Sequence, residues 1–260
     1  MGLLDGKRGV ILNIANDRSI AWHIANRAVQ QGAQCAFGFL PIEKMERRVR
    51  KAMEEGGFAQ MPLFPCDVTN DDSIAEFVAS VKNTLGEIDF VVHSLAFANK
   101  DFLQMGRFTD TPRDVFKQAL DISAYSLIAL ARAFAPLMPA SGGSIICMSY
   151  LGAEKVIPGY NVMGVAKAAL ESSARYLAYE LGAKNIRVNS ISAGPVRTLS
   201  AMAVGGIDNV FDHVENKSPL RRNIDGDEVG KAAVYLLSDL SSGITGETLH
   251  VDCGYSIVGL

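Results

Sequence analysis

Short apolar runs alternate with helix-like segments from one end of the chain to the other, and this alternation limits the possible folds more than any other feature. The apolar runs are nearly continuous in Val, Ile and Leu, as in strands buried on both faces, and they lie at residues 9–14, 34–39, 61–66, 88–94, 144–148, 186–191 and 248–251. Helical patterns lie between them, at residues 20–31, 43–55, 71–85, 112–138, 168–182 and 226–237. This order predicts one doubly wound α/β domain over residues 1–260, with a parallel sheet of about seven strands and helices on both faces.

Composition argues against several classes of function. The 260 residues carry a net charge of −3 with 20% charged side chains, so neither nucleic acid nor a membrane surface is indicated as a partner. The four cysteines and four histidines lack metal-ligand spacing, so we expect no metal site, and reduced thiols as in a cytoplasmic protein. The first residues do not form a signal peptide, and no apolar run is expected to reach membrane-spanning length.

Doubly wound sheets bind their ligands beyond the carboxyl ends of the strands, at the point where the strand order reverses. The residues at these positions form the candidate site: Asn13 to Ser19, Leu40, Asp67, Ser94 to Ala98, Tyr150 and Ala193 to Thr198. They follow different strands, so we expect the fold to gather them along one edge of the sheet.

The stretch from Ser149 to Lys167 carries the most informative chemistry. Tyr160 and Lys167 are seven residues apart, about two helical turns, so both side chains lie on one face if Tyr160 begins a helix. An ammonium near a phenol lowers the pKa of the phenol, which can then donate a proton near neutral pH. Tyr150 ends the preceding strand and can reach the same space. The spacing alone fits a packed tyrosine and a solvated lysine equally well.

The loop after the first strand is the candidate phosphate site. It holds no glycine, so the G-x-G-x-x-G fingerprint of dinucleotide-binding proteins is absent. A strand, a tight loop and a helix N-terminus still form an anion site by geometry, with Asn13 suited to left-handed backbone and Ser19 suited to an N-cap or a phosphate contact. A plain helix cap explains the same residues, so the loop alone does not decide.

The end of the second strand bears on the choice between NADH and NADPH. Leu40 stands where NAD enzymes usually carry an acid for the ribose diol. The nearby Lys44, Arg47 and Arg48 suit either a 2′-phosphate or a solvated helix face. Asp67 can accept a hydrogen bond from an adenine amino group or cap the turn that follows it. The residues by themselves leave the cofactor open.

Many segments, in order, resemble one known family. They are Ile14 to Ala21, Cys66 to Val68, His93 to Ala98, Asp121 to Ser126, Ser149 to Lys167, Ile191 to Thr198, Ser218 to Arg222 and Gly246 to Asp252. The chain resembles the divergent short-chain reductases and, more narrowly, the bacterial enoyl-acyl-carrier-protein reductases of type II fatty acid synthesis. Ordinary short-chain dehydrogenases have Tyr-x-x-x-Lys, whereas here Gly164 stands four residues after Tyr160 and the lysine comes at seven.

The resemblance implies a Rossmann-type oxidoreductase that reduces the trans-2 double bond of an enoyl thioester on acyl carrier protein. It favours NAD(H) as the cofactor and leaves NADP(H) open. Hydride would go to the β-carbon, while Tyr160 stabilises the enolate and Lys167 holds the nicotinamide ribose. Tyr150 would line the substrate pocket, and Ala98 would border the substrate. The other implied cofactor contacts are Asn13, Ser19, Ile20, Leu40, Asp67, Val68, Leu95, Val196, Arg197, Thr198, Leu199 and Ser200.

Two residues depart from the pattern of the family. Asn13 and His23 stand where the family generally has glycine. We expect Asn13 to crowd the backbone against the pyrophosphate and His23 to loosen the packing between the first helix and the sheet. Both departures bear on cofactor affinity rather than on the fold.

The resemblance implies further features outside the reacting centre. Residues 199–213, with Gly205 and Gly206 inside, would form a mobile flap over the acyl chain, although an ordinary pair of amphipathic helices fits the same pattern. The family is usually a homotetramer, so we expect one here. Lys217, Arg221 and Arg222 fit either contact with an acidic carrier protein or a solvated surface.

Two other functions compete with this one. A ketone or 3-oxoacyl reductase of the same fold would have a catalytic serine about where Tyr150 stands, together with Tyr-x-x-x-Lys, and this chain has neither. A dinucleotide-binding regulatory protein would bind NAD(H) and leave an enoyl thioester untouched. Turnover therefore separates the regulatory protein from the enzyme.

Overall fold

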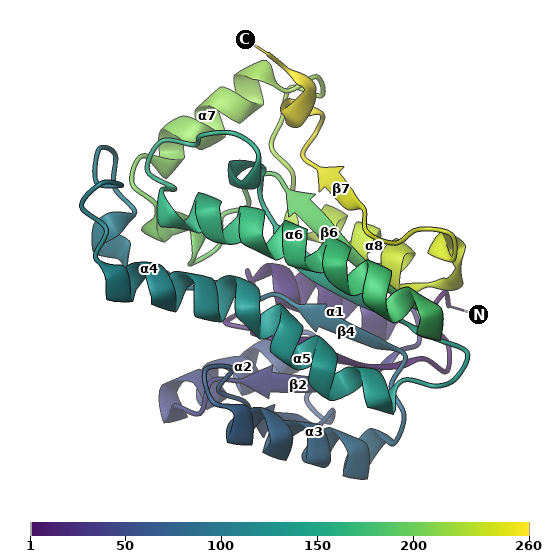
Figure 1. Ribbon diagram of the computed structural model, residues 1–260. Helices are drawn as coiled ribbons and strands as arrows, with labels where there is room; N and C mark the ends of the chain where they lie inside the picture. The colour runs from purple at the N-terminus through teal and green to yellow at the C-terminus, as the bar shows by residue number, and fades with distance from the viewer. Residues whose placement is uncertain (1, 260) are drawn as a thin grey trace.

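The computed structural model describes residues 2–259, which contain one seven-stranded sheet (Figure 1). Its strands are β1 (Arg8–Leu12), β2 (Gln34–Phe39), β3 (Leu63–Pro65), β4 (Phe90–His93), β5 (Gly143–Ser149), β6 (Ile186–Ala193) and β7 (Thr248–Val251). All the pairings in this sheet are parallel, in the spatial order β3-β2-β1-β4-β5-β6-β7. The order reverses between β1 and β4, which is where a doubly wound sheet binds its ligand.

The helices confirm the predicted fold class. They are α1 (Ile20–Gln30), α2 (Glu43–Glu55), α3 (Asp71–Leu85), α4 (Arg113–Leu120), α5 (Ser126–Phe134), α6 (Val162–Leu181), α7 (Ile207–Lys217) and α8 (Gly226–Leu237). The bounds of α2, α3 and α8 agree with the sequence patterns. In contrast, α6 begins at Val162 rather than at residue 168, because apolar periodicity does not reveal where its first turn forms.

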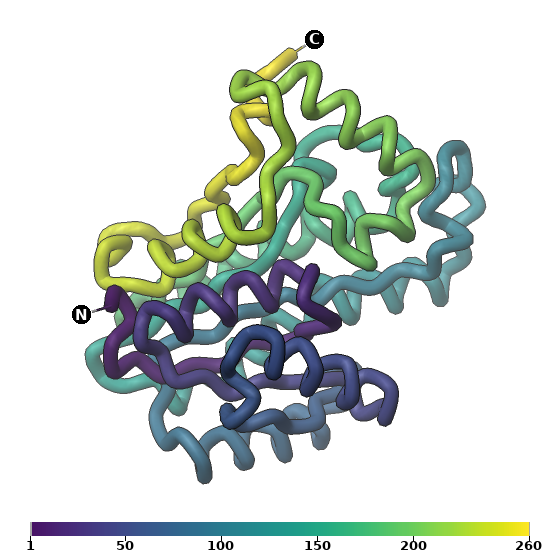
Figure 2. The backbone as a smooth tube through the Cα atoms, turned by 180° about the vertical axis from the view of Figure 1, so that it is seen from behind, coloured from purple at the N-terminus to yellow at the C-terminus, as the bar shows by residue number. Residues whose placement is uncertain are grey.

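Two apolar layers enclose the sheet. In Figure 1 the helices α3, α5 and α6 lie in front of it, and Figure 2 shows the opposite face, where α1 is drawn in purple and α8 in yellow-green. Neighbouring strand residues point into different layers: Ile146 packs with α1, α2 and α8, whereas Ile145 packs with α3, α5 and α6. Both side chains are fully buried, which is why the strands are continuously apolar.

The long helix predicted over residues 112–138 is interrupted. A π-helical turn at Asp121–Tyr125 separates α4 from α5, and a 3-10 turn at Ala135–Leu137 ends the run. By length and composition Arg113–Leu137 could cross a membrane, which corrects the expectation that no apolar run reaches that length. Half of its most apolar window is buried, however, and α5 packs against α3 and α6.

The histidine on α1 does not face the sheet. The ring of His23 lies against Gly226 of α8 and its carbonyl lies against Gly230, so a Cβ at either glycine would collide with it. On the same helix, Ile24 and Ala28 are fully buried in the core. The expectation that His23 loosens the packing of α1 on the sheet is therefore wrong, because two glycines on α8 make room for the ring.

A third and smaller apolar cluster lies beyond the carboxyl edge of the sheet. Its buried members are Leu103, Ala119, Val162, Met163, Val204, Ile207 and Phe211. Residues 199–213 contribute to it through a 3-10 turn at Ala201–Ala203 and the first turns of α7. Gly206 joins the two with φ 78°, a left-handed conformation that favours glycine. The segment predicted to be a flap therefore packs on the elements around the site through a small core.

Candidate active site

A cavity of about 360 Å³ opens at the carboxyl edge of the sheet. Its walls come from the loops after β1, β4, β5 and β6, from the start of α6 and from residues 198–207. Small-molecule sites commonly have volumes of about 300–1,000 Å³. Many of the residues predicted from sequence line it: Asn13, Ser19, Ile20, Leu95, Ala98, Tyr150, Tyr160, Lys167, Val196, Thr198 and Ser200.

Tyr150 and Tyr160 meet edge to face in the cavity wall, with ring centroids 4.9 Å apart and ring planes at 74°. Tyr160 precedes α6 rather than beginning it, because Asn161 has φ 46° and stands before the first helical residue. The amide of Asn161 donates to the carbonyls of Phe102 and Gln104 at 2.7 and 2.8 Å. This fixed turn, rather than helical periodicity, places Tyr160 beside Tyr150.

The hydroxyl of Tyr150 is buried and has no hydrogen-bond partner in the part of the chain that the structure describes. Buried hydroxyls in proteins are nearly always paired, so an unpaired one in the wall of a cavity indicates a place for a ligand atom. The ring belongs to the residue that directly follows β5, and the end of that strand fixes its position.

Lys167 lies in α6 with 4% of its surface exposed. Its ammonium donates to the carbonyl of Met148, near the end of β5, at 2.7 Å. Burial lowers the pKa of Lys167 to about 8. The ammonium has further N–H donors, and the side chain lines the cavity, so it can also bind a hydroxyl-bearing ligand.

Both phenols of the site keep their protons at neutral pH. Burial raises the pKa of Tyr160 and of Tyr150 well above the ordinary value of 10. The expectation that Lys167 lowers the pKa of Tyr160 is therefore wrong, because the loss of hydration around a buried phenolate is the largest influence. A neutral Tyr160 donates a hydrogen bond, which suits it to stabilise negative charge that develops on a ligand oxygen.

The loop after β1 has a geometry that suits an anion, although it holds no glycine. Asn13 has φ 72°, and its side-chain amide donates to the carbonyl of Ser94 at 2.9 Å. Ser19 is the N-cap of α1 by position, but its hydroxyl donates to the carbonyl of Asn16 at 2.7 Å instead of capping the helix. The first turn of α1 holds no acidic residue. N–H groups at the start of a helix need partners, so this end of α1 suits a phosphate.

Five of the predicted cofactor residues do not line the cavity: Leu40, Asp67, Val68, Arg197 and Leu199. Leu40 is 43% exposed at the end of β2. One carboxylate oxygen of Asp67 accepts from the backbone N–H and the hydroxyl of Thr69, at 3.0 and 2.7 Å, and thereby caps a turn. The guanidinium of Arg197 lies 4.3 Å from the centre of the Phe211 ring. These residues nevertheless follow β2, β3 and β6, along the same edge of the sheet.

Sequence reasoning missed several apolar residues of the cavity: Leu103, Met148, Ile157 and Met163. Met163 lies within the stretch from Ser149 to Lys167 that the sequence singled out, but an apolar residue there reads as ordinary core. Leu103 comes from a distant loop, and no local pattern distinguishes it from an ordinary core residue. The apolar wall suits an acyl chain, and Tyr150, Tyr160 and Lys167 add polar groups to the same cavity.

Within residues 2–259, no group of three or more His, Cys, Asp or Glu side chains is placed to hold a metal ion. The four cysteines are buried free thiols. Burial raises the pKa of Cys35 and of Cys66 to about 12, so these thiols are poor nucleophiles. The donors in the cavity are hydroxyls and an ammonium, and such groups fit an organic cofactor with ribose and phosphate groups.

Known proteins of one family match the whole chain. The family model described as Enoyl-(Acyl carrier protein) reductase matches residues 14–256. The enoyl-[acyl-carrier-protein] reductase [NADH] of Synechocystis is 50% identical over 259 residues and covers 99% of each chain. The protein of that name from Bacillus cereus is 48% identical over 259 residues and covers 100% of each chain.

Solved structures agree with the sequence relatives. The enoyl-acyl carrier protein reductase of Bacillus cereus, in complex with NADP⁺ and indole naphthyridinone, matches with a TM-score of 0.96 and 48% identity over 100% of both chains. The Anaplasma phagocytophilum reductase in complex with NAD matches with a TM-score of 0.94 and 48% identity, over 100% of this chain and 97% of that one. On its sequence and its fold together, this chain belongs to the enoyl-(acyl carrier protein) reductase family.

Proposed function

We propose that the chain reduces the trans-2 double bond of enoyl thioesters carried on acyl carrier protein, with NADH, as a step of fatty acid synthesis. The observation that carries this proposal is the grouping of Tyr150, Tyr160 and Lys167 in one apolar cavity beside an anion site. Curated relatives that are about half identical over their whole length carry the name of this NADH-dependent enzyme. NADPH stays a second candidate, because one structural relative was solved with NADP⁺.

Hydride addition to the β-carbon of an enoyl thioester leaves negative charge on the thioester oxygen. Tyr160 is the proposed donor to this oxygen, since burial keeps its phenol protonated and its ring lies in the cavity wall. Tyr150, whose hydroxyl has no partner in the described chain, is the proposed second contact on the same side of the substrate. Ala98 borders the acyl chain in this arrangement.

The nicotinamide supplies the hydride when the cofactor is bound, and the protein holds it in place. Lys167 is the proposed ligand of the nicotinamide ribose, because its ammonium is buried in the cavity and fixed by the Met148 carbonyl. Asn13, Ser19 and Ile20 are proposed to face the pyrophosphate at the start of α1. The remaining proposed contacts are Leu40, Asp67, Val68 and Leu95 on the adenosine side, with Val196, Arg197, Thr198, Leu199 and Ser200 on the nicotinamide side.

The test is to follow the loss of reduced-nicotinamide absorbance with purified protein and crotonyl thioester, first with NADH and then with NADPH. We expect oxidation with NADH, the cofactor that the names of the sequence relatives carry, while the result with NADPH shows whether Lys44, Arg47 and Arg48 accept a 2′-phosphate. Cofactor binding without oxidation of either would support the regulatory protein instead.

We also propose a homotetramer in the cytoplasm. Large side chains on α6 and the adjoining helical run are exposed, including Tyr125, Val165, Tyr176 and Tyr179, of which Tyr179 is 90% exposed. Exposed apolar faces of this kind commonly become interfaces between copies. The buried free thiols support a reducing compartment. Sedimentation as a monomer at micromolar concentration would contradict the tetramer.

Lys217, Arg221 and Arg222, the basic residues proposed to contact the carrier protein, differ in whether their side chains are already hydrogen-bonded within the chain. The guanidinium of Arg222 forms two hydrogen bonds to Glu228, at 2.8 and 2.7 Å, and that of Arg221 donates to the Asn216 carbonyl. Lys217 ends α7, the helix whose first residue, Ile207, lines the cavity. We therefore keep Lys217 as the first residue to test for contact with the carrier protein.

A further inference from the structure

The loop of residues 94–99, which follows β4, forms one wall of the cavity with no helix or strand of its own. Side chains from outside the loop hold it at two places. On the cofactor side, Asn13 donates to the carbonyl of Ser94 at 2.9 Å. On the substrate side, the backbone N–H of Phe97 donates to the hydroxyl of Ser123 at 3.0 Å. The two anchors come from different elements, so they can act independently.

Ser123 lies in the π-helical turn that separates α4 from α5 and is completely buried. A serine inside a helix usually bonds a carbonyl of its own helix, as Ser126 does with the Ile122 carbonyl at 2.7 Å. The hydroxyl of Ser123 instead leaves the helix, accepts from the N–H of Phe97 and lies 3.3 Å from the carbonyl of the same residue. Turns of the π type are uncommon and occur frequently at functional sites.

The same hydroxyl also reaches the helix that follows the catalytic tyrosine. It lies 3.9 Å from the sulfur of Met163, which lines the cavity one turn after Tyr160. Phe97 lines the cavity as well, next to Ala98. Ser123 therefore touches two parts of the cavity wall from behind, the loop after β4 and the start of α6, without lining the cavity itself.

We propose that Ser123 is a positioning residue for the substrate: its bond to Phe97 fixes the distance between the wall that borders the enoyl thioester and the phenol of Tyr160. This inference rests on the proposed function and adds to it a residue that does not touch the substrate. Loss of the hydroxyl leaves the Phe97 N–H without its partner and frees the wall to move. The wall contacts the substrate in the ground state and in the transition state alike, so its movement weakens substrate binding more than it slows the chemical step.

The experiment is a steady-state comparison of wild type and Ser123→Ala with crotonyl thioester and NADH, together with a fluorescence titration of NADH alone. In Ser123→Ala we expect KM for the thioester to rise about tenfold and kcat to change by less than about threefold. The Kd for NADH should stay at the wild-type value, because the Asn13 anchor is intact. Ser123→Cys keeps a weak donor and acceptor at this position and should give an intermediate KM.

Ser126→Ala is the matched control. Ser126 is completely buried in the same helical run, but its hydroxyl bonds His93 at 2.7 Å and the Ile122 carbonyl rather than the cavity wall. We expect a similar loss of Tm and an unchanged KM. Asn13→Asp gives the opposite contrast: a carboxylate cannot donate to the Ser94 carbonyl, so this variant loses the cofactor-side anchor and should raise the Kd for NADH more than the KM for the thioester.

Three results would overturn the role of Ser123. They are a wild-type KM in Ser123→Ala, an equal rise of KM in Ser126→Ala, and a rise of the Kd for NADH as large as the rise of KM. If Ser123→Ala does not fold, Ser123→Cys carries the test, and a wild-type KM in that variant would overturn the role in the same way. A wild-type protein that binds NADH and does not reduce the thioester would instead overturn the proposed function, and the substrate role of Ser123 with it.

Discussion

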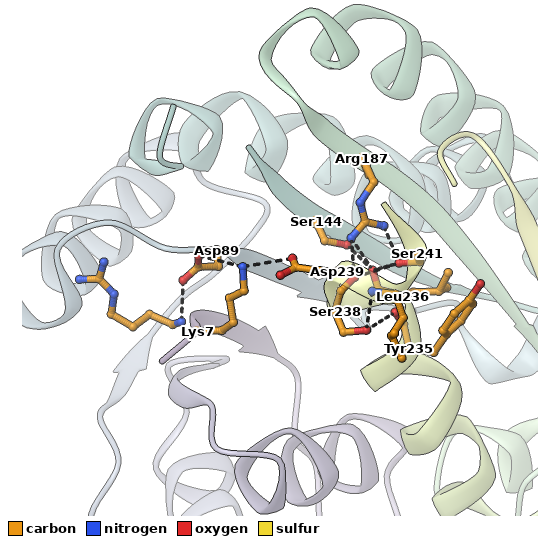
Figure 3. Close-up of polar contacts among 11 residues, drawn as sticks. Lys7, Asp89, Ser144, Arg187, Tyr235, Leu236, Ser238, Asp239 and Ser241 are labelled. Atoms are coloured by element: carbon orange, nitrogen blue, oxygen red, sulfur yellow. Dashed lines mark hydrogen bonds and ion pairs between the residues drawn. The ribbon is translucent and has the colours of Figure 1, made fainter. Parts of the chain in front are cut away.

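The two ends of the sheet differ in whether their buried polar groups have hydrogen-bond partners within the described chain. At the amino ends of the strands, Arg187 donates to the carbonyls of Leu236 and Ser238 at 3.0 and 3.2 Å and to the hydroxyl of Ser241 at 2.8 Å (Figure 3). Ser144 adds a bond to the Leu236 carbonyl at 2.8 Å. The last carbonyls of α8, which a helix leaves unpaired, are thereby satisfied from β5 and β6.

Charged groups at the amino end are paired as well. The ammonium of Lys7 lies 3.3 Å from a carboxylate oxygen of Asp239 and 3.8 Å from one of Asp89 (Figure 3). Asp89 also accepts from the backbone N–H of Arg8 at 2.8 Å. These contacts join the starts of β1 and β4 to the end of α8, so the charged groups at this edge of the sheet are paired within the fold.

At the carboxyl end of the sheet, in contrast, buried polar groups keep hydrogen-bonding capacity that a ligand can use. The hydroxyl of Tyr150 has no partner in the described chain, and the buried ammonium of Lys167 donates to the Met148 carbonyl. Burial shifts the pKa of both groups toward the neutral form. Polar groups that are kept unpaired for a ligand generally lower the stability of the free protein. The comparison of the two ends indicates that this loss of stability is confined to the carboxyl edge of the sheet.

Tyr160→Phe should give the largest effect of any change at the carboxyl end. Loss of one donor to a developing oxyanion lowers kcat by about 100- to 1,000-fold, whereas the ring of Tyr160, which packs against Tyr150, is kept in the variant. The measurement is NADH oxidation with crotonyl thioester, with NADH titrated separately. A kcat within about twofold of wild type would remove Tyr160 from the enolate step.

Lys167→Met should separate binding from stability. Loss of a charged donor weakens NADH binding by about tenfold to a hundredfold.

The same variant tests stability. The pKa of Lys167 in the folded protein is about 8, below its ordinary value of 10.5, so protonation opposes folding, and stability falls as the pH drops from 10.5 to about 8. At neutral pH the variant without cofactor should therefore gain stability, by up to about 3 kcal/mol. Urea unfolding with and without NADH measures both, and a less stable apoprotein would contradict the assignment.

Arg187→Met, at the amino end of the sheet, should lower the stability of the fold and leave catalysis and binding unchanged. It removes the charged donor to the carbonyls of Leu236 and Ser238, although each carbonyl keeps another donor, and the loss of hydrogen bonds from a charged group costs about 1–3 kcal/mol of stability. The side chain lies far from the cavity in the sheet, at the opposite ends of the strands. We expect a lower urea midpoint and an unchanged kcat and KM below the transition. A changed KM would mean that the two ends are coupled.

The smallest expected effect is a pH dependence at the carboxyl end. With a pKa of about 8, the ammonium of Lys167 loses its proton as the pH rises through that value. NADH affinity should therefore fall severalfold between about pH 7 and about pH 9 and recover on return to the lower pH. The same titration on Lys167→Met should be flat. A wild-type affinity that is constant over this range would show that the charge of Lys167 does not matter for binding.

Much of the fold followed from local patterns in the chain. Continuous apolar runs such as Gln34–Phe39 determined the buried strands, since a strand covered on both faces has no polar alternation. Helix boundaries were predictable where a residue caps them, as at Asp71–Leu85 after Asn70, whose side chain accepts from the N–H groups of Asp72 and Ser73. The identity of the family also followed from motifs that the printed sequence contains.

Tertiary structure alone decided the properties of the site. The raised pKa of Tyr160 depends on burial, which the seven-residue spacing to Lys167 does not reveal. The anchor of Phe97 on Ser123 joins residues that are 26 positions apart and needs a π turn inside a helix that the pattern predicted as continuous. Periodicity records which residues are buried in an element, whereas a pKa or an anchor depends on which elements the fold brings together.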